Sequence, residues 1–347
     1  MRVLVTGATG FIGANLVREL LASGYQVRAL VRPTSNTASL KGLDVELAQG
    51  DITETASLGL ALEGCQALFH AAAAYTLWHR HPQAIYRANV QGTENILAAA
   101  QKIGIEKVVY TSSVAAVGRL PHGSGTEDTL LDSRGLVGHY KRSKYLAEKV
   151  ALRFAAEGLP VVIVNPSTPI GPWDAKPTPT GRIVLDFLNG RMPAYIDTGL
   201  NVVHVRDVAR GHILALERGK TGCRYILGHL NLTMKDLLQK LAEVTGLPAP
   251  RHRLPWGLAL ALGYIDYAIE GKLLRREPRI PLEGVRMARK PMYYDASKAV
   301  RELGLPQTPI GHALVDAARW FLDHGYVKKT PQARSTPLKA GGQAGPG

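Results

Sequence analysis

Six short apolar runs, each separated from the next by a segment that can form a helix, constrain the fold of this chain more than any other feature. They cover residues 3–5, 27–31, 45–48, 67–69, 108–110 and 161–164. Strands that alternate with helices usually lie parallel in one sheet, because each helix carries the chain back across a sheet face. The pattern therefore predicts an α/β fold built on a doubly wound parallel sheet.

A glycine-rich segment follows the first apolar run directly and reads Gly7-Ala-Thr-Gly10-Phe-Ile-Gly13. A glycine turn between a strand and a helix brings backbone N–H groups and the positive helix end up to a pyrophosphate, so it can bind a dinucleotide. Such turns also occur for packing alone. The residues that we expect at a cofactor are Gly7, Thr9, Gly10, Phe11 and Ile12.

The pattern changes after Pro166, where Pro-rich loops, short strands near 202–205 and 223–227 and several helices follow. A chain of 347 residues is long enough for two domains. We expect a dinucleotide-binding Rossmann domain over 1–166, with later returns near 202–227, and a smaller, interleaved C-terminal domain over 167–327 that mainly binds substrate. Residues 328–347 are basic, contain no acids and are rich in Gly, Pro, Ala and Gln, which predicts a disordered tail.

Tyr140 and Lys144 stand four residues apart, hence on one face if the segment is helical. The ammonium could then lower the pKa of the phenol and make it an acid or base near neutral pH. The plain alternative for such a pair is a solvated helix face. Ser113, the last residue of Thr111-Ser112-Ser113, follows a strand-like run, where ligands of a parallel sheet bind. Together with the glycine turn, these residues predict a site for hydride transfer.

The end of the second apolar run bears on the choice of cofactor. An acidic residue roughly 20 positions beyond the glycines binds the ribose 2′-hydroxyl of NAD, whereas an arginine there accommodates the 2′-phosphate of NADP. Arg32 occupies this position, with Arg28, Ser35 and Lys41 near it in the sequence. NADP(H) is therefore the preferred prediction, and NAD stays open because Arg32 could be an ordinary surface residue.

These motifs, together with three lesser ones, resemble the extended short-chain dehydrogenase/reductase superfamily over almost all of the chain before its tail. The lesser ones are Phe69-His-Ala-Ala72, Asn89-Val-Gln-Gly-Thr-Glu-Asn95 and Asn165-Pro-Ser167. Within the superfamily the chain is most similar to the hopanoid-associated sugar epimerase group, a neighbour of dihydroflavonol-reductase-like proteins. That closer similarity lies in residues 30–35, 139–144, 164–171 and 177–181.

The resemblance implies a role for each motif. Tyr140 would act as acid or base, Ser113 rather than Ser112 would hydrogen-bond the substrate oxygen, and Lys144 would also hold the nicotinamide ribose. It adds Asp51, Ile52, Ala71, Ala72, Asn165, Pro166 and Ser167 to the cofactor site. It implies that Tyr75, Trp78, Val137 and Arg182 line the substrate pocket, and that Asn89 has a structural role. It also suggests a homodimer formed by the helices that carry Asn89 and Tyr140.

Three functions are compatible with these residues. The first is an NADP(H)-dependent reductase or dehydrogenase acting on a carbonyl or carbinol of a bulky substrate. The second is a nucleotide-sugar epimerase or dehydratase of hopanoid head-group synthesis, which would cycle its cofactor internally. Many sugar epimerases of the superfamily carry Tyr near the position of Val117 and prefer NAD, so Val117 and Arg32 both depart from that pattern. The third, a non-catalytic dinucleotide sensor, is disfavoured by the intact Ser113, Tyr140 and Lys144.

Composition and the distribution of charge and cysteine bear on whether the chain is a membrane, secreted, metal-binding or nucleic-acid-binding protein. No apolar run approaches the roughly 20 residues of a membrane span, and the chain starts with a strand rather than a cleavable signal, so we expect a cytoplasmic protein. Cys65 and Cys223 form no metal-binding or disulfide pattern. The net charge of +14 is concentrated in the tail and in residues 251–290, and no nucleic-acid-binding module accompanies it, so nucleic acid is not an expected partner.

The basic stretch 251–290 follows the apolar, Trp-bearing run 254–264. Two interpretations remain open. A lid helix packed on the substrate domain is favoured, because an uninterrupted apolar run suits burial. The alternative is contact with an anionic membrane surface, with Arg275, Arg276 and Arg279 beside the apolar residues.

Overall fold

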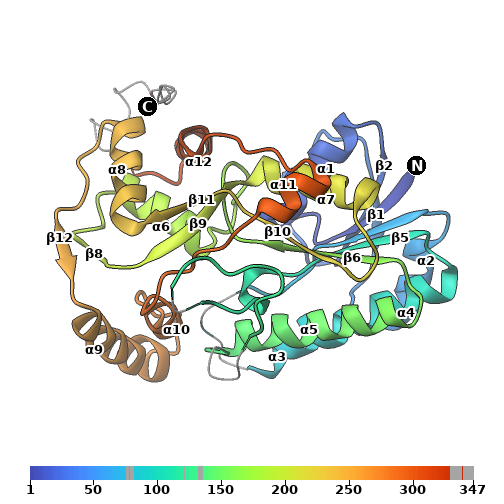
Figure 1. Ribbon diagram of the computed structural model, residues 1–347, viewed down its shortest axis with the longest axis horizontal. Helices are drawn as coiled ribbons and strands as arrows, with labels where there is room; N and C mark the ends of the chain where they lie inside the picture. Colours follow the sequence, from blue (N-terminus) through green and yellow to red (C-terminus); the bar gives the residue numbers. More distant parts are fainter. Residues whose placement is uncertain (76–77, 79–81, 121, 132–135, 329–337, 339–347) are drawn as a thin grey trace.

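A seven-stranded parallel sheet forms the centre of the protein (Figure 1). The computed structural model describes residues 1–75, 78, 82–120, 122–131, 136–328 and 338, so the predicted disordered tail lies almost wholly outside the described residues. The strand order is β10-β6-β5-β4-β1-β2-β3, and every pairing in this sheet is parallel. The strands are β1 (Arg2–Thr6), β2 (Gln26–Val31), β3 (Val45–Gln49), β4 (Ala67–His70), β5 (Lys107–Thr111), β6 (Val161–Pro166) and β10 (Arg224–Leu227). The six apolar runs are the first six of these strands, which confirms the predicted fold class.

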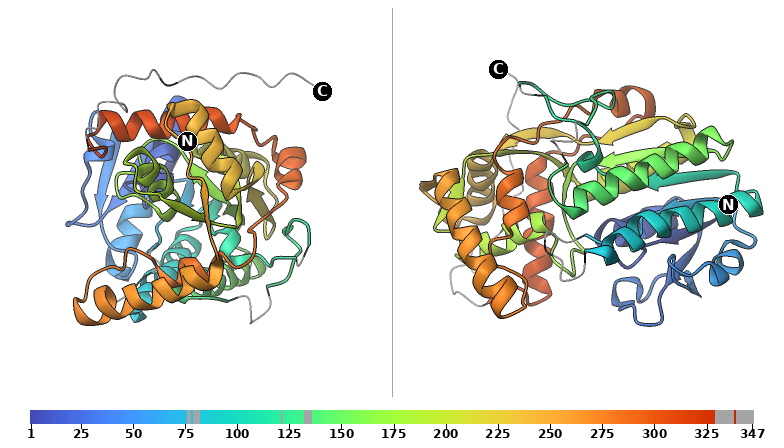
Figure 2. Two further views of the ribbon diagram at one scale, coloured as in Figure 1. Left: turned by 90° about the vertical axis from the view of Figure 1, so that its left-hand side faces the viewer. Right: turned by 90° about the horizontal axis from the view of Figure 1, so that it is seen from below.

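Helices cover both faces of the sheet. One face packs against α1 (Phe11–Ala22), α7 (Val205–Arg218) and α11 (Ser297–Leu303). The other packs against α2 (Leu58–Leu62), α4 (Gly92–Ile103) and α5 (His139–Ala156). The right-hand view of Figure 2 shows α4 and α5 side by side along the sheet. Because β4 and β6 have helices on both sides, their residues are buried throughout, as parallel strands require.

The strand order reverses at the centre of the sheet. The chain runs outward from β1 through β2 to β3, and then returns to the other side of β1 with β4. In an open parallel sheet this reversal leaves a crevice outside the carboxyl ends of the strands, and ligands bind there. The ends of β1, β4 and β5 therefore mark where a functional site is expected.

A second layer of small sheets and helices follows β6. It contains the three-stranded sheet β11-β9-β7 and the two-stranded sheet β12-β8. The strands are β7 (Thr168–Ile170), β8 (Ala194–Ile196), β9 (Gly199–His204), β11 (Leu230–Thr233) and β12 (His252–Leu254). Three helices, α6 (Pro179–Leu188), α8 (Met234–Thr245) and α12 (Ile310–Asp323), share an apolar core with β7, β8, β9 and β11. The chain thus leaves the large sheet after β6, returns for α7 and β10, and leaves again.

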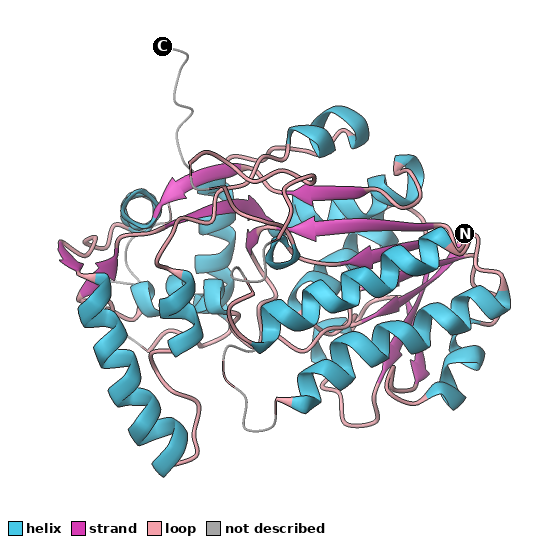
Figure 3. Ribbon diagram, turned by 60° about the horizontal axis from the view of Figure 1, so that its bottom comes forward, coloured by secondary structure: helices cyan, strands magenta, loops and turns pink. Residues whose placement is uncertain are grey.

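An arm of two helices lies at the edge of the second layer. It consists of α9 (Trp256–Asp266), the π-helical continuation η6 (Tyr267–Leu273) and α10 (Leu282–Met287). Figures 1 and 3 both show α9 at the periphery of the molecule, joined to β12. Only Ala259 and Gly263 of α9 are buried. None of the described helices is both long and apolar enough to cross a membrane.

Candidate active site

The glycine loop after β1 packs against the chain that leaves β4. Gly7 has a φ of +71°, and a Cβ there would lie 2.6 Å from the backbone nitrogen of Ala72. A Cβ on Gly13 would lie 2.1 Å from the carbonyl oxygen of Gly7. Side chains are thus excluded at both positions, and the loop is a bare backbone cradle. The residues present fit a dinucleotide pyrophosphate.

The first turn of α1 completes this cradle. Gly10 is the N-cap of the helix, and no side chain caps it. An uncapped helix start presents free N–H groups and the positive end of the helix dipole to an anion. Phe11 and Ile12 are the first two residues of the helix, and Thr9 lies in the turn just before its N-cap. The structure also brings Ala71 and Ala72, at the end of β4, next to the glycine loop.

Arg32 lies directly after β2 and is exposed. Its backbone N–H donates to the hydroxyl oxygen of Ser35 at 3.2 Å, which closes a turn at the strand end. Arg28, which was expected near the cofactor together with Arg32, is instead engaged by other residues of the protein. It lies inside β2, pairs with Glu46 at 2.8 Å and donates to the carbonyl oxygen of Glu63 at 2.7 Å. The strand register explains this difference, because only the residue after the last strand position reaches the ligand edge.

Asp51 and Ile52 form the turn after β3. The Asp51 carboxylate accepts from the backbone N–H of Thr53 at 2.8 Å and from its hydroxyl at 2.9 Å. The Ile52 carbonyl accepts from Asn95 of α4 at 2.9 Å. Both residues therefore lie at the carboxyl edge of the sheet, the edge that carries the glycine loop and Arg32.

Ser113 and Tyr140 are brought together by two separate elements. Ser113 follows β5 and accepts a hydrogen bond from the backbone N–H of Ala115 at 3.1 Å. Tyr140 lies in the first turn of α5. Burial raises the pKa of Tyr140 to about 12, and the neighbouring Ser113 side chain opposes part of that rise. Ser113, and not Ser112, is among the groups that shift the pKa of Tyr140, so the geometry favours Ser113 for the hydroxyl role.

Lys144 lies one turn after Tyr140, and its ammonium is held at the end of β5. It donates to the carbonyl oxygen of Thr111 at 2.7 Å and to the Tyr110 hydroxyl at 3.2 Å. Burial lowers the pKa of Lys144 to about 8, while Glu148 on the same helix face raises it. The expectation that this ammonium lowers the pKa of Tyr140 is not met in this structure, because its contacts are with Thr111 and Tyr110 and the phenol is desolvated.

Asn89 joins the loop after β4 to α5. Its amide nitrogen donates to the Ser143 hydroxyl at 2.9 Å and to the Ala74 carbonyl at 3.1 Å, and its side-chain oxygen accepts from the Ala74 N–H at 2.7 Å. The side chain is buried and does not contact Tyr140. These contacts agree with the structural role expected for it.

Three contacts of the site were not predicted from the sequence. Asn165 donates to Glu148 at 2.7 Å and to the carbonyl of Ser113 at 3.1 Å, and so ties β6 and α5 to the serine. Glu148 stands eight residues after Tyr140, two turns along the same helix face, and that spacing could have revealed it. Glu283 of the arm accepts from the backbone N–H of His139 at 3.2 Å and so caps α5 beside Tyr140. No local pattern connects residues so far apart in the sequence.

The expected substrate-lining residues do not share one environment. The Tyr75 ring lies against that of Tyr140, with centroids 4.4 Å apart. Trp78 lies beside the arm, since a Cβ on Gly271 would be 3.3 Å from its indole nitrogen. Val137 directly precedes Gly138, the residue before α5. Arg182 is paired with Glu277 of the arm at 3.1 Å.

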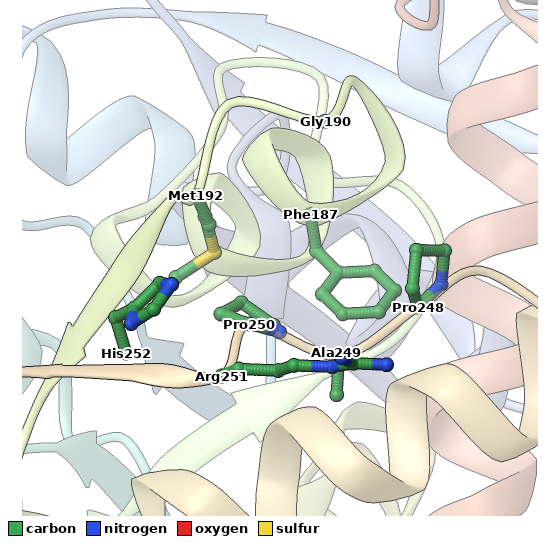
Figure 4. A pocket seen from close by; sticks show the side chains of 8 residues that line it. All are labelled: Phe187, Gly190, Met192, Pro248, Ala249, Pro250, Arg251 and His252. Carbon is green, nitrogen blue, oxygen red and sulfur yellow. The ribbon is translucent and has the colours of Figure 1, made fainter.

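A cavity of about 350 Å³ lies in the second layer and is lined by other residues than the predicted substrate-lining ones. As Figure 4 shows, Phe187 and Met192 face the segment before β12 across it. The lining residues are Phe187, Gly190, Met192, Pro248, Ala249, Pro250, Arg251 and His252. None of them belongs to the predicted site, so this cavity is separate from the groups around Tyr140.

Known proteins share both the sequence and the fold. The model of the NAD dependent epimerase/dehydratase family matches residues 3–228. A putative dihydroflavonol 4-reductase from Synechocystis is 54% identical, covering 93% of this chain and 95% of its own. Sterol demethylase protein B from Methylococcus capsulatus is 39% identical, covering 94% and 100%. The crystal structure of a nucleoside-diphosphate-sugar epimerase from Pseudomonas aeruginosa is 30% identical, with a TM-score of 0.79 and coverage of 94% and 99%.

Proposed function

The chain belongs to the NAD-dependent epimerase/dehydratase family of extended short-chain dehydrogenases/reductases, and we propose that it is an NADP(H)-dependent oxidoreductase of a bulky carbonyl or carbinol substrate. The observation that carries the proposal is the meeting of three groups: the Ser113 side chain neighbours Tyr140, and Lys144 lies one helical turn after Tyr140 with its ammonium at the end of β5. A hydroxyl, a phenol and an ammonium at the ligand edge of a parallel sheet are suited to proton transfer on a substrate oxygen.

The cofactor would be held by residues that fit its parts. The glycine cradle and the start of α1 suit the pyrophosphate, and Arg32 suits the 2′-phosphate of NADP. The nicotinamide side would lie near Lys144 and the loop formed by Asn165, Pro166 and Ser167. The buried Ser167 hydroxyl has no partner among the described residues, so it is available for such a contact. A bound nicotinamide would supply or accept the hydride.

The protein groups handle the proton in this proposal. With a pKa near 12 Tyr140 is protonated at neutral pH, so it is ready to give its proton to the oxygen of a carbonyl that is being reduced. The Ser113 hydroxyl would donate a hydrogen bond to the same oxygen as negative charge develops. Reduction leaves a tyrosinate at this position, which must regain a proton before the next turnover. In the oxidative direction the same tyrosinate would accept the proton of the carbinol.

Arg32 supports NADP(H) over NAD as the preferred cofactor. Its guanidinium follows the second strand, is exposed and has no ion-pair partner within the described part of the chain. A free guanidinium at this point can form charge-assisted hydrogen bonds to a phosphate. A carboxylate, which would favour the 2′-hydroxyl of NAD, does not occupy the position.

The substrate side supports a bulky, weakly charged molecule. Tyr75 offers an exposed aromatic face beside Tyr140, and Trp78 lies farther out against the arm. Arg182, the candidate for a diphosphate clamp, is engaged by Glu277. The names of two relatives, a dihydroflavonol reductase and a sterol demethylase protein, are consistent with ring substrates.

A nucleotide-sugar epimerase or dehydratase, acting in hopanoid head-group synthesis, is the second candidate. The similarity to a nucleoside-diphosphate-sugar epimerase over nearly the whole chain favours it. Against it stands Val117, which is fully buried, at the position near which many sugar epimerases carry a tyrosine. Such an enzyme would oxidise and reduce the same substrate without net consumption of cofactor.

A titration with NADPH and NADH, followed by fluorescence, tests the cofactor part of the proposal. The wild type should prefer NADPH, and Arg32→Asp should bind NADPH about 10- to 100-fold more weakly because it loses a charge-assisted phosphate contact. Arg301→Asp, at an exposed arginine of α11, is the matched control and should bind as the wild type does. Equal binding of the two cofactors by the wild type would remove the role given to Arg32 and favour the epimerase.

The stoichiometry of turnover tests the reaction. With a panel of bulky carbonyl compounds, a reductase consumes one NADPH for each carbonyl reduced, measured by the loss of nicotinamide absorbance. With nucleotide sugars an epimerase converts substrate while the absorbance stays constant. Conversion of a nucleotide sugar without net NADPH loss would overturn the reductase proposal.

A further inference from the structure

The arm presents its apolar side chains to solvent. Along α9 and η6, residues spaced by four, three, four and four positions lie on one helical face. Each of them is at least 38% exposed, and the last is 76% exposed. The residues of this apolar ridge are Leu258, Leu262, Ile265, Ile269 and Leu273. The ridge extends over about 20 Å at 1.5 Å per residue.

The face of the same helix that packs on the protein is mixed, and includes the half-buried side chains of Trp256 and Leu260. Ala259 and Gly263 are buried against the protein, and Asp266 and Glu270 continue this face. The Asp266 carboxylate accepts from the backbone N–H of Ile280 at 2.7 Å, and so holds the end of the arm against its return strand. A helix on the surface of a globular protein normally turns its apolar side inward. Here a further apolar face, the ridge, is exposed, so burial against this protein does not explain it.

Two further carboxylates of the arm bind groups in the body of the protein. Glu277 pairs with Arg182 at 3.1 Å, and Glu283 caps α5 at the backbone N–H of His139. Their charges are therefore committed to the body of the protein. The outward charge of the arm is left to its basic residues.

Those basic residues stand at the far end of the ridge. Lys272, Arg275, Arg276 and Arg279 are all exposed, and none of them pairs with a carboxylate among the described residues. Exposed apolar side chains beside unpaired cations match the two components of an anionic lipid surface, its hydrocarbon boundary and its phosphate headgroups. Neither component alone gives firm attachment, and the arm supplies both.

We propose that α9 and η6 dock on an anionic lipid bilayer, with the apolar ridge inserted at the level of the headgroups and Lys272, Arg275, Arg276 and Arg279 paired with lipid phosphates. The helix would lie in the plane of the surface, since it is too short to cross it. The docked arm carries Glu283 at the start of α5 and borders Trp78, so the contact would lie beside the predicted substrate side.

Sedimentation with vesicles tests the proposal on the full-length protein. We expect the wild type to sediment with vesicles of phosphatidylcholine and phosphatidylglycerol, to bind phosphatidylcholine alone far more weakly, and to lose affinity at high salt. Ile265→Asp combined with Leu273→Asp should abolish binding. Arg275→Ala combined with Arg276→Ala should weaken binding to the anionic vesicles roughly tenfold or more.

Matched substitutions outside the arm act as controls. Leu60→Asp replaces a leucine of α2 that is 73% exposed, and Arg301→Ala removes an exposed arginine of α11. Both should bind vesicles as the wild type does. All variants should keep the wild-type circular dichroism spectrum and NADPH affinity, which separates this proposal from the one on function, because vesicle binding needs no turnover.

Two results would overturn the proposal. One is a wild type that does not sediment with anionic vesicles, or whose binding is unchanged by the paired Asp substitutions. The other is a dimer, measured by light scattering, that Ile265→Asp and Leu273→Asp convert to monomer while vesicle binding is absent. That outcome would assign the ridge to a second copy of this chain.

Discussion

The ammonium of Lys144 donates to the carbonyl oxygen of Thr111 at 2.7 Å. Thr111 is the last residue of β5, so this bond fixes the position of the charge two residues before Ser113 and one helical turn after Tyr140. The second donor contact, to the Tyr110 hydroxyl, keeps the side chain inside the protein. The cost of that burial appears in the pKa of Lys144, which falls to about 8.

This depressed pKa predicts the pH dependence of activity. Lys144 is charged below pH 8 and neutral above it, because burial favours the neutral amine. We expect NADPH-dependent reduction to be level near pH 7 and to fall as the pH rises through about 8. A pH profile of kcat/KM measures this directly.

Two conservative variants identify the group responsible. Lys144→Arg keeps its charge at high pH, so its profile, although lower overall, should lack the fall near pH 8. Lys141 is also buried, with its pKa lowered to about 8, and Lys141→Arg should keep the fall. The reverse pattern would show that Lys141, not Lys144, controls the profile.

Tyr140→Phe tests the acid directly. The substitution removes one hydroxyl and keeps the ring that lies against Tyr75. We expect kcat to fall about 10²- to 10⁴-fold, since the proton donor is lost, with the NADPH dissociation constant nearly unchanged. Tyr145→Phe, on the same helix, is the control and should retain full activity. A Tyr140→Phe enzyme within a few-fold of wild type would exclude the phenol as the acid.

Gly13→Ala tests the glycine cradle. The added Cβ would lie 2.1 Å from the carbonyl oxygen of Gly7, so the loop must shift. We expect loss of measurable NADPH binding and a decrease of about 1–3 kcal/mol in the free energy of unfolding. Gly59→Ala, in α2, meets no atom within 4 Å and should raise stability by about 0.5–1 kcal/mol. Calorimetry and fluorescence titration measure both, and unchanged NADPH binding by Gly13→Ala would argue against the cradle.

The features that could be predicted from the sequence are those with local patterns. The apolar runs coincide with strands because parallel strands buried on both faces must be apolar throughout. The glycine turn and the spacing of Tyr140 and Lys144 are equally local. Sheet topology then brings Ser113 to Tyr140, since residues that follow neighbouring strands meet at one edge.

The features that were missed depend on contacts between distant residues. Arg28 and Arg32 are four positions apart and look alike in the sequence, but the strand end separates a structural arginine from an exposed one. Glu283 reaches the backbone of His139 across 144 residues, which no pattern shows. The apolar run 254–264 predicted burial, whereas the structure exposes much of it, because periodicity alone cannot say which surface an apolar face meets.

The position of β10 has a consequence for how the protein is made. This strand covers β6 by pairing Arg224 with Ile163 and Leu227 with Pro166, although some sixty residues separate the two strands. Until Leu227 has left the ribosome, β6 presents an unpaired backbone edge on a strand whose side chains are all apolar or buried. We therefore expect a fragment that stops at Pro166 to aggregate through the unpaired edge of β6. Synthesis through β10 would cover that edge.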